Sequence, residues 1–207
     1  EDNKNISDAY LGWIDLFGWG TSGYTRIMPY EKSIDDKDYA FSSEYKNIAY
    51  TNYDWGQYNA ISNGGNKAGL WRMLSDSEWH YVLYNRANAR ELYSQATVNG
   101  VTGLILLPDD WVAPIGIFFL PVVNDWTFNT YTSLEWEQME AAGAVFIPAV
   151  GRRYFSSVLS IGVLGFVWSA SYYDSGHVCY LFFDSDEVYM GNGSRNYGQS
   201  VRLVQDF

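Results

Sequence analysis

The chain has 207 residues, a formal net charge of −11 and a sequence pI near 4.4, and 18% of its residues are aromatic. A surface this acidic repels phosphate backbones, which excludes nucleic acid as an expected partner, and no apolar run reaches the roughly 18 residues that suggest a transmembrane helix. One cysteine, Cys179, and two histidines, His80 and His177, supply neither a disulfide framework nor a Cys/His metal site, so we expect no cofactor.

The first 70 residues are rich in Gly, Asn, Asp and Tyr and show little helical or strand periodicity. Their high aromatic density argues against disorder. We therefore expect one domain over 1–207, in which a loop-rich part, 1–70, packs on a core formed by 71–207. The aromatic residues expected to hold the loops on the core are Trp13, Phe17, Trp19, Trp55 and Tyr58. The opening "EDNKNISDAY" has no initiator Met and reads as a processed or trimmed N-terminus.

A first helix is predicted within residues 74–93. Ser75 and Glu78 have the S-x-x-E spacing of a capping box, which satisfies two early backbone N–H groups. The apolar residues that follow, Trp79, Val82 and Leu83, fall on one helical face.

A second helix is predicted within residues 131–143. Thr132 and Glu135 repeat the capping-box spacing, and Trp136 and Met139 supply an apolar stripe. Gly143 suits the left-handed residue that ends many helices.

Short strand-like runs lie between and after these helices. They are 102–108, 144–150, 162–171, 178–183, 187–190 and 199–204. Two capped helices followed by short strands indicate an α+β domain with a mostly antiparallel twisted sheet and long irregular loops.

Six segments stand in a specific order along the chain: "WRMLSDSEWHYVL", "GLILLPDDW", "YTSLEWEQMEAAGAVFIPAVGRR", "GFVWSASYYDS", "YLFFDS" and "SRNYGQSVRLV". This order resembles the FISUMP-type bacterial paralogous domains, which are similar to C-type-lectin-fold proteins and to variable proteins diversified by retroelements. The resemblance covers residues 71–205. It implies a C-type-lectin-like fold whose N- and C-terminal elements meet, in a protein that is exported or attached to the cell surface.

The resemblance also divides the C-terminal segment into a sheet framework and displayed positions that contact a ligand. The framework positions are Trp168, Leu181, Phe183, Arg195, Gly198, Val201, Arg202 and Leu203. The displayed positions are Tyr172, Tyr173, Asp174, His177, Tyr180, Phe182, Tyr189, Asn192, Ser194, Asn196 and Tyr197.

Strand alternation supports part of this division independently. Tyr180 and Phe182 share one face of a strand, and the alternate apolar residues share the other. If the apolar face is core, the aromatic pair faces outward beside Tyr189 and Tyr197. Tyr mixed with Ser, Gly and Asn is also the composition of antibody paratopes. The alternative is that Tyr180 and Phe182 pack under the N-terminal loops.

A glycosidase mechanism would need two carboxylates that face each other across a cleft. Several acidic residues have the oxygen atoms that Ca²⁺ takes as ligands. They are Asp109, Asp110, Asp125, Asp184, Asp186 and Glu187. The Glu/Gln-Pro-Asn/Asp and Trp-Asn-Asp triplets of sugar-binding lectin-fold relatives do not occur, and no spacing singles out a carboxylate pair. The sequence Asp184-Ser185-Asp186 is more typical of a β-turn than of a metal site.

Nucleophilic catalysis and anion binding find little support. Cys179 is expected to face the core as a small hydrophobe, although His177 lies only two residues away, and the formylglycine-generating enzymes of similar fold need two cysteines. Arg152 and Arg153 are expected to tether a loop through carboxylates rather than to clamp an anionic ligand.

We therefore expect a non-enzymatic binding module that is extracellular or on the cell surface. It would bind a protein or glycan through its C-terminal Tyr/Asn/Ser-rich face. Two alternatives remain open: a structural surface or pilus-like subunit whose aromatic patch is an assembly interface, and a glycan-active enzyme with a carboxylate pair.

Overall fold

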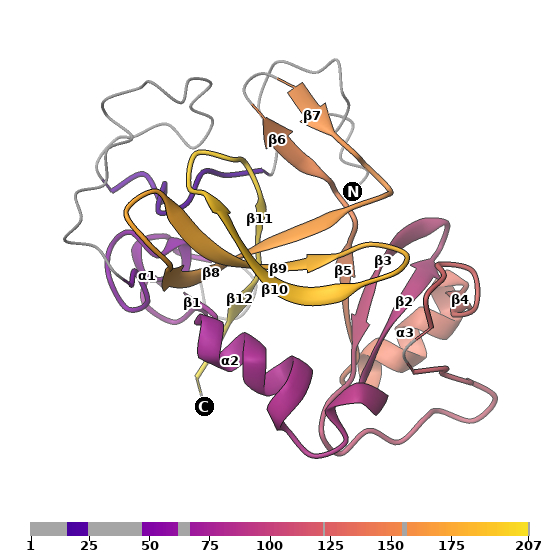
Figure 1. Ribbon diagram of the computed structural model, residues 1–207. Coiled ribbons are helices and arrows are strands. Elements are labelled where there is room, and N and C mark those ends of the chain that lie inside the picture. The colour runs from indigo at the N-terminus through magenta and orange to yellow at the C-terminus, as the bar shows by residue number, and fades with distance from the viewer. Residues whose placement is uncertain (1–15, 25–46, 62–66, 122, 155–156, 207) are drawn as a thin grey trace.

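A computed structural model describes residues 16–24, 47–61, 67–121, 123–154 and 157–206 (Figure 1). It has the predicted α+β composition: two four-stranded sheets lie side by side, and short helices pack on them. Trp13, expected to anchor the N-terminal loops, lies outside the described residues. Trp19 is fully buried and donates its indole N–H to the Ser169 carbonyl at 2.8 Å, so this part of the loop region is held on the core.

The first sheet is formed by the C-terminal strands in the order β10-β9-β8-β11. Its strands are β8 (Gly165–Tyr172), β9 (His177–Phe183), β10 (Val188–Ser194) and β11 (Ser200–Val201). β11 pairs in parallel with β8, and the other pairs are antiparallel. The β8–β9 register shifts between Trp168 and Tyr172, which marks a bulge.

The second sheet has the order β4-β2-β3-β5, and its β2–β4 pair is parallel. Its strands are β2 (Tyr93–Val98), β3 (Val101–Leu106), β4 (Thr130–Tyr131) and β5 (Val145–Pro148). Two antiparallel ribbons complete the described strands. One joins β1 (Arg72–Met73) to β12 (Leu203–Val204), and the other joins β6 (Arg152–Tyr154) to β7 (Ser157–Leu159).

The first predicted helix is shorter than expected. Its α-helical part, α2 (Asp76–His80), has the predicted capping box, and it continues as a π-helical turn, η2 (Tyr81–Asn85). The buried Arg86 side chain then donates to the carbonyls of Val82, Leu92 and Leu107, which satisfies groups near the end of the helix. A positive φ of 55° at Asn88 turns the chain into a 3₁₀ turn, η3 (Ala89–Glu91), before β2 begins.

The second predicted helix is confirmed as α3 (Ser133–Ala141). Thr132 and Glu135 form the capping box, Met139 is fully buried, and Gly143 has φ of 94°. A further four-residue helix, α1 (Trp55–Tyr58), begins at Asp54, whose carboxylate accepts the Gly56 N–H.

The main core lies where the two sheets and α2 meet. Trp79 and Leu83 come from α2 and η2, Leu104 from the second sheet, and Leu181 and Phe183 from the first, and each is at most 1% exposed. The expected core face of β9 is therefore confirmed. In the described chain no helix has both the length and the apolar composition needed to cross a bilayer.

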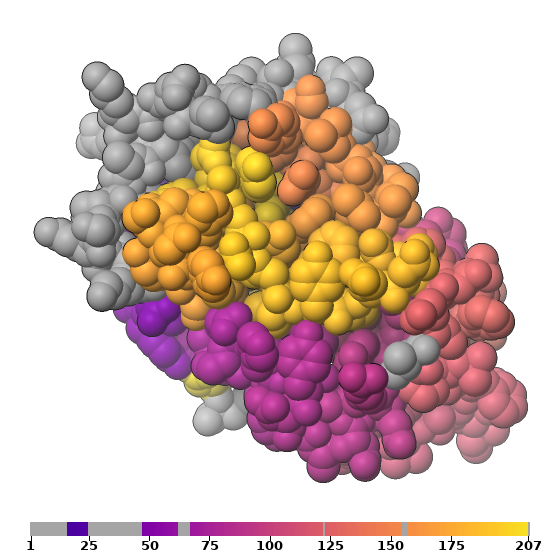
Figure 2. Space-filling model, in the orientation of Figure 1, coloured from indigo at the N-terminus to yellow at the C-terminus, as the bar shows by residue number. Residues whose placement is uncertain are grey.

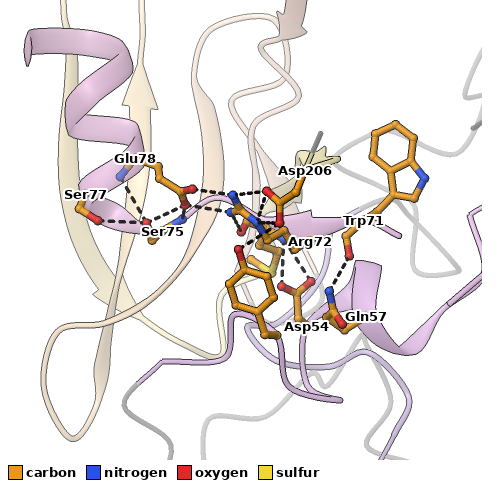
Figure 3. Close-up of polar contacts among 10 residues, drawn as sticks. Asp54, Gln57, Trp71, Arg72, Ser75, Ser77, Glu78 and Asp206 are labelled. Carbon is orange, nitrogen blue, oxygen red and sulfur yellow. Dashed lines mark hydrogen bonds and ion pairs between the residues drawn. The ribbon is translucent and has the colours of Figure 1, made fainter. Parts of the chain in front are cut away.

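A compact ionic cluster joins segments that are far apart in sequence (Figure 3). Arg72 on β1 binds Glu78 of α2 through two contacts of 2.6 and 2.9 Å, and it binds Asp206 after β12 through contacts of 2.7 to 3.0 Å. Tyr50 donates to Asp206 at 3.1 Å and places its ring 5.2 Å from the Arg72 guanidinium. The fully buried Asp54 accepts the Met73 N–H. This cluster fixes the C-terminal segment against the start of α2.

Candidate binding surface

The first sheet has two faces with different roles. Its inner face, which includes Leu181 and Phe183, packs on α2 and the second sheet. Its outer face is aromatic, because Trp168 lies opposite Tyr180 and Phe166 lies opposite Phe182 in the β8–β9 register. The N-terminal segment covers one end of the outer face, where Trp168 is fully buried and donates its indole N–H to the Phe17 carbonyl at 2.7 Å.

The eleven displayed positions differ in accessibility. Five are exposed: Tyr173, Asp174, His177, Tyr189 and Asn192. Five are half-buried: Tyr172, Tyr180, Ser194, Asn196 and Tyr197. Phe182 differs from the expectation of an outward contact residue, because it is only 9% exposed and lies between Phe166 and Tyr189.

The displayed positions on β9 and β10 also fall on both faces of the sheet. Tyr189 lies opposite Phe182 on the outer face. Asn192 lies opposite Cys179, and Ser194 opposite His177, and this alternation puts them on the inner-face side. The eleven positions therefore do not form one coplanar surface. Of the framework positions, Arg202 is exposed, whereas the others are buried or half-buried.

Residues of the outer face, of β6 and of the segment after β10 form a series of ring and cation–π contacts, which we call the aromatic strip. Its members are Tyr154, Tyr197, Arg152, Phe166, Tyr180, Phe182 and Tyr189. Successive ring centroids in the pairs Tyr154–Tyr197, Phe166–Phe182 and Phe182–Tyr189 are 5.4, 5.2 and 4.8 Å apart. Tyr180 adds edge-on contacts to Phe166 and Trp168 at 5.5 and 6.0 Å. Edge-on and tilted geometries of this kind are favourable for aromatic pairs.

Arg152 joins the two halves of the aromatic strip. Its guanidinium carbon lies 5.0 Å from the Tyr197 ring centroid and 5.2 Å from that of Phe166, so aromatic rings hold it by cation–π contacts. Among the residues that the structure describes, it forms no ion pair with a carboxylate. The expected carboxylate tether is therefore wrong for Arg152. Arg153 is 4% exposed, and its backbone pairs with Gly198.

Two glycines on β10 leave room for the Tyr180 ring. A Cβ added to Gly191 or Gly193 would lie 2.9 Å from atoms of that ring, closer than real contacts allow. Burial raises the pKa of the Tyr180 hydroxyl, and burial followed by the charges of Glu187 and Asp184 raises that of Tyr189. Both hydroxyls therefore stay neutral at physiological pH and can donate as well as accept hydrogen bonds.

Three displayed residues outside the aromatic strip, Tyr173, Asp174 and His177, lie at the β8–β9 turn. The Asp174 carboxylate accepts the N–H groups of Gly176 and His177 at 2.8 and 2.9 Å and lies 2.8 Å from His177 Nδ1. These hydrogen bonds, led by that from Gly176, lower the pKa of Asp174. Arg195 donates to the Ser175 carbonyl from the adjoining end of β10. This turn is thus closed by its own hydrogen bonds.

The expected turn at Asp184 is confirmed, since its carboxylate accepts the N–H groups of both Asp186 and Glu187 at 2.8 Å. Within the described ranges, no three His, Cys, Asp or Glu side chains gather as metal ligands would. Cys179 is 8% exposed, and burial raises the pKa of its thiol to about 12. A thiol with this pKa is almost entirely protonated at neutral pH, which makes it a poor nucleophile.

Comparison with known proteins gives no relative from which a role could be transferred: no family model, no curated protein and no solved structure matches this chain.

Proposed function

We propose that this chain is a non-enzymatic binding module, secreted or on the cell surface, that recognises a protein or glycan through the aromatic strip. The observation that carries the proposal is the series of ring and cation–π contacts from Tyr154 on β6 to Tyr189 on the outer face of the first sheet. Both end residues are more than a third exposed. Rigid aromatic side chains bind partners at a low cost in conformational entropy.

We also propose that the α+β arrangement is a C-type-lectin-like fold of the FISUMP type. Support comes from the order of the sequence segments, from the pairing of β1 with β12 and from the long irregular loops. The proposed location of the protein, on the cell surface or outside the cell, follows from the same resemblance.

The experiment is a glycan array and a pull-down from host proteins, each run with the unaltered protein, Tyr180→Ala and Tyr197→Ala. Tyr81→Ala is the matched control, because Tyr81 is 51% exposed and lies outside the aromatic strip. We expect each strip variant to weaken binding about 30-fold, as for a central tyrosine of an interface, and the control to bind normally. Binding that survives both strip substitutions would place the site elsewhere.

A second candidate function is that of a structural surface subunit, and an exposed apolar loop favours it. Ile115 is fully exposed, Phe118 is 84% exposed and Val112 is 78% exposed, which is unusual for apolar side chains that have no partner. An assembly contact would cover them. Light scattering at increasing concentration tests this candidate: oligomers that dissociate on Phe118→Asp would support it, and a monomer at all concentrations would contradict it.

A further inference from the structure

A cavity lies at one end of the aromatic strip, where the two sheets approach each other. Its volume is about 330 Å³, within the range of small-molecule sites. The lining comes from β2, from the turns η2 and η3, from Asn124, and from the β9–β10 hairpin together with the start of β10. In Figure 2 the yellow C-terminal strands cross the visible face and end against the magenta and coral segments that supply the other walls.

Two residues of β2, Tyr93 and Gln95, form the buried part of the lining. They are two positions apart, so they share one face of the strand. Gln95 is only 3% exposed, yet its side-chain amide has no hydrogen-bond partner among the residues that the structure describes. It is not among the polar atoms sealed from solvent, so the amide reaches the cavity. Water in the cavity can pair with this amide, and a ligand hydroxyl that takes the place of that water keeps the amide hydrogen-bonded.

Two more tyrosines line the accessible part of the cavity. Tyr84 is 41% exposed, and its hydroxyl accepts the Met190 N–H at 3.3 Å, which fixes it against β10. Tyr189 is 39% exposed and rests on Phe182 with 4.8 Å between ring centroids. Both rings are therefore held in place while part of their surface remains accessible to a ligand.

Charged groups of both signs line the same cavity without pairing. Arg90 is exposed, and within the described chain it makes no ion pair, although Asp186 and Glu187 also line the cavity. Asp186 accepts only the neighbouring Ser185 hydroxyl at 3.2 Å, and the Asn124 side chain is exposed. Hydrogen-bond donors and acceptors are thus both available to a ligand.

We propose that this cavity binds a neutral saccharide unit. An anionic ligand would meet the two carboxylates, a cationic one would meet Arg90, and an apolar one would leave the Gln95 amide unpaired. Sugar hydroxyls both donate and accept, so one ring can pair with an amide, a carboxylate and a guanidinium together. Its polarised C–H face suits the negative face of a tyrosine ring. The inference rests on the proposed binding function and chooses glycan over protein as the ligand.

The two carboxylates indicate binding rather than hydrolysis. Asp186 and Glu187 are neighbours on one turn, whereas glycosidases place their two carboxylates on either side of the scissile bond. A saccharide held here is expected to leave unchanged.

The test is calorimetric titration of the full chain with the methyl glycosides of glucose, galactose, mannose and N-acetylglucosamine, and with choline and inorganic phosphate as charged comparisons. We expect at least one glycoside to bind with a Kd near 1 mM or tighter, and the charged comparisons not to bind. Tyr84→Ala and Gln95→Met should each weaken that binding about tenfold. Tyr81→Ala is the matched control, because Tyr81 lies on the same turn, is exposed and does not line the cavity.

The reactivity of Cys179 toward a thiol reagent reports whether each variant is folded. The buried thiol should react slowly in a folded variant and rapidly in an unfolded one. The aromatic-strip variants Tyr180→Ala and Tyr197→Ala separate this inference from the proposed function, since neither residue lines the cavity. If they abolish capture of a large ligand but leave glycoside binding intact, both proposals stand. If the protein binds a glycoside but captures no large ligand, the saccharide site in the cavity is supported and the aromatic strip has no binding role. Four results would overturn the saccharide site. They are no glycoside binding at about 10 mM, stronger binding of choline or phosphate, glycoside binding that neither cavity variant weakens, and cleavage of the glycoside.

Discussion

Arg72 and Arg90 each share a small region of the molecule with two carboxylates, but only Arg72 is paired with them. The Arg72 guanidinium is bound to Glu78 and Asp206 at 2.6 to 3.0 Å, and its side chain is 10% exposed. Arg90 lines the cavity with Asp186 and Glu187 and, among the described residues, is joined to neither.

This difference indicates that the Arg72 cluster stabilises the fold, whereas the cavity lined by Arg90 is suited to binding a ligand. The donors and acceptors of the Arg72 cluster are paired with one another and join β1, α2 and the C-terminal segment, so few of them are available to a ligand. The polar side chains of the cavity are open to solvent and, among the described residues, form no ion pairs, so they remain available to a ligand.

The largest expected effect distinguishes the two arginines by stability. Arg72→Leu removes a buried guanidinium and its hydrogen bonds to two partly exposed carboxylates, which water can then solvate, and should lower the free energy of unfolding by about 2 kcal/mol. Arg90→Leu removes no contact seen among the described residues and should change it by less than about 0.5 kcal/mol. Urea unfolding at pH 7 measures both. Arg72→Lys, which keeps the charge but not the bidentate geometry, should fall between them. Equal losses for the two leucine variants would contradict the distinction.

The second expected effect is a pH dependence that belongs to the Arg72 cluster. Burial alone would raise the pKa of Glu78, but hydrogen bonds from Arg72 and Ser75 outweigh it and leave the pKa lowered. The hydrogen bond from Arg72 lowers the pKa of Asp206. An acid whose pKa is lower in the folded state stabilises the fold above its unfolded pKa, about 4, and this contribution is lost as the pH falls through the folded pKa.

The stability gap between the unaltered protein and Arg72→Leu should therefore be widest near pH 7 and narrow below about pH 4. The pKa of Asp54 is shifted in the opposite direction: burial raises it, and the charge of Arg72 opposes that increase. Removing Arg72 makes the raised pKa of Asp54 higher still, which also narrows the gap in acid. Urea midpoints across this range provide the measurement, and a gap that stays constant with pH would show that the cluster does not control these carboxyl groups.

Features that depend on near neighbours could be predicted from the sequence. Both capping boxes follow from three-residue spacings, and the buried face of β9 follows from strand alternation. The end of the first helix could not be predicted in this way. It depends on Arg86 reaching carbonyls as far away as Leu107, which no local pattern records.

The candidate site was only partly predictable for the same reason. The displayed positions on β10 look alike in sequence, and only the register with β9 shows that Tyr189 and Asn192 lie on opposite faces. The cavity is harder still, because Gln95, Asn124 and Glu187 come from three distant segments. The capping-box spacing accounts for only part of what Glu78 does, because Glu78 also binds Arg72, and no pattern around Glu78 reveals that contact.

The smallest expected effect compares two buried amides that lie beside each other. Asn129 is 2% exposed and fully used, since its side chain donates to the carbonyls of Gln95 and Leu120 and accepts the Leu120 N–H. Gln95 is 3% exposed, and its own amide is without a partner in the described chain. Gln95→Met should therefore change the free energy of unfolding by less than about 0.5 kcal/mol, because the Gln95 amide makes no hydrogen bond within the described chain and reaches the solvent of the cavity.

Asn129→Leu is the matched control and should lower the same free energy by about 2 kcal/mol, since it leaves backbone groups unpaired. Urea unfolding of the two variants beside the unaltered protein tests the contrast. If Gln95→Met destabilised the protein as much as Asn129→Leu does, the Gln95 amide would have a structural partner. The amide would then be paired within the protein, as the Arg72 guanidinium is, and it would not be available to a ligand in the cavity. Nearly unchanged stability together with weaker glycoside binding is the result expected of a residue kept for binding rather than for folding.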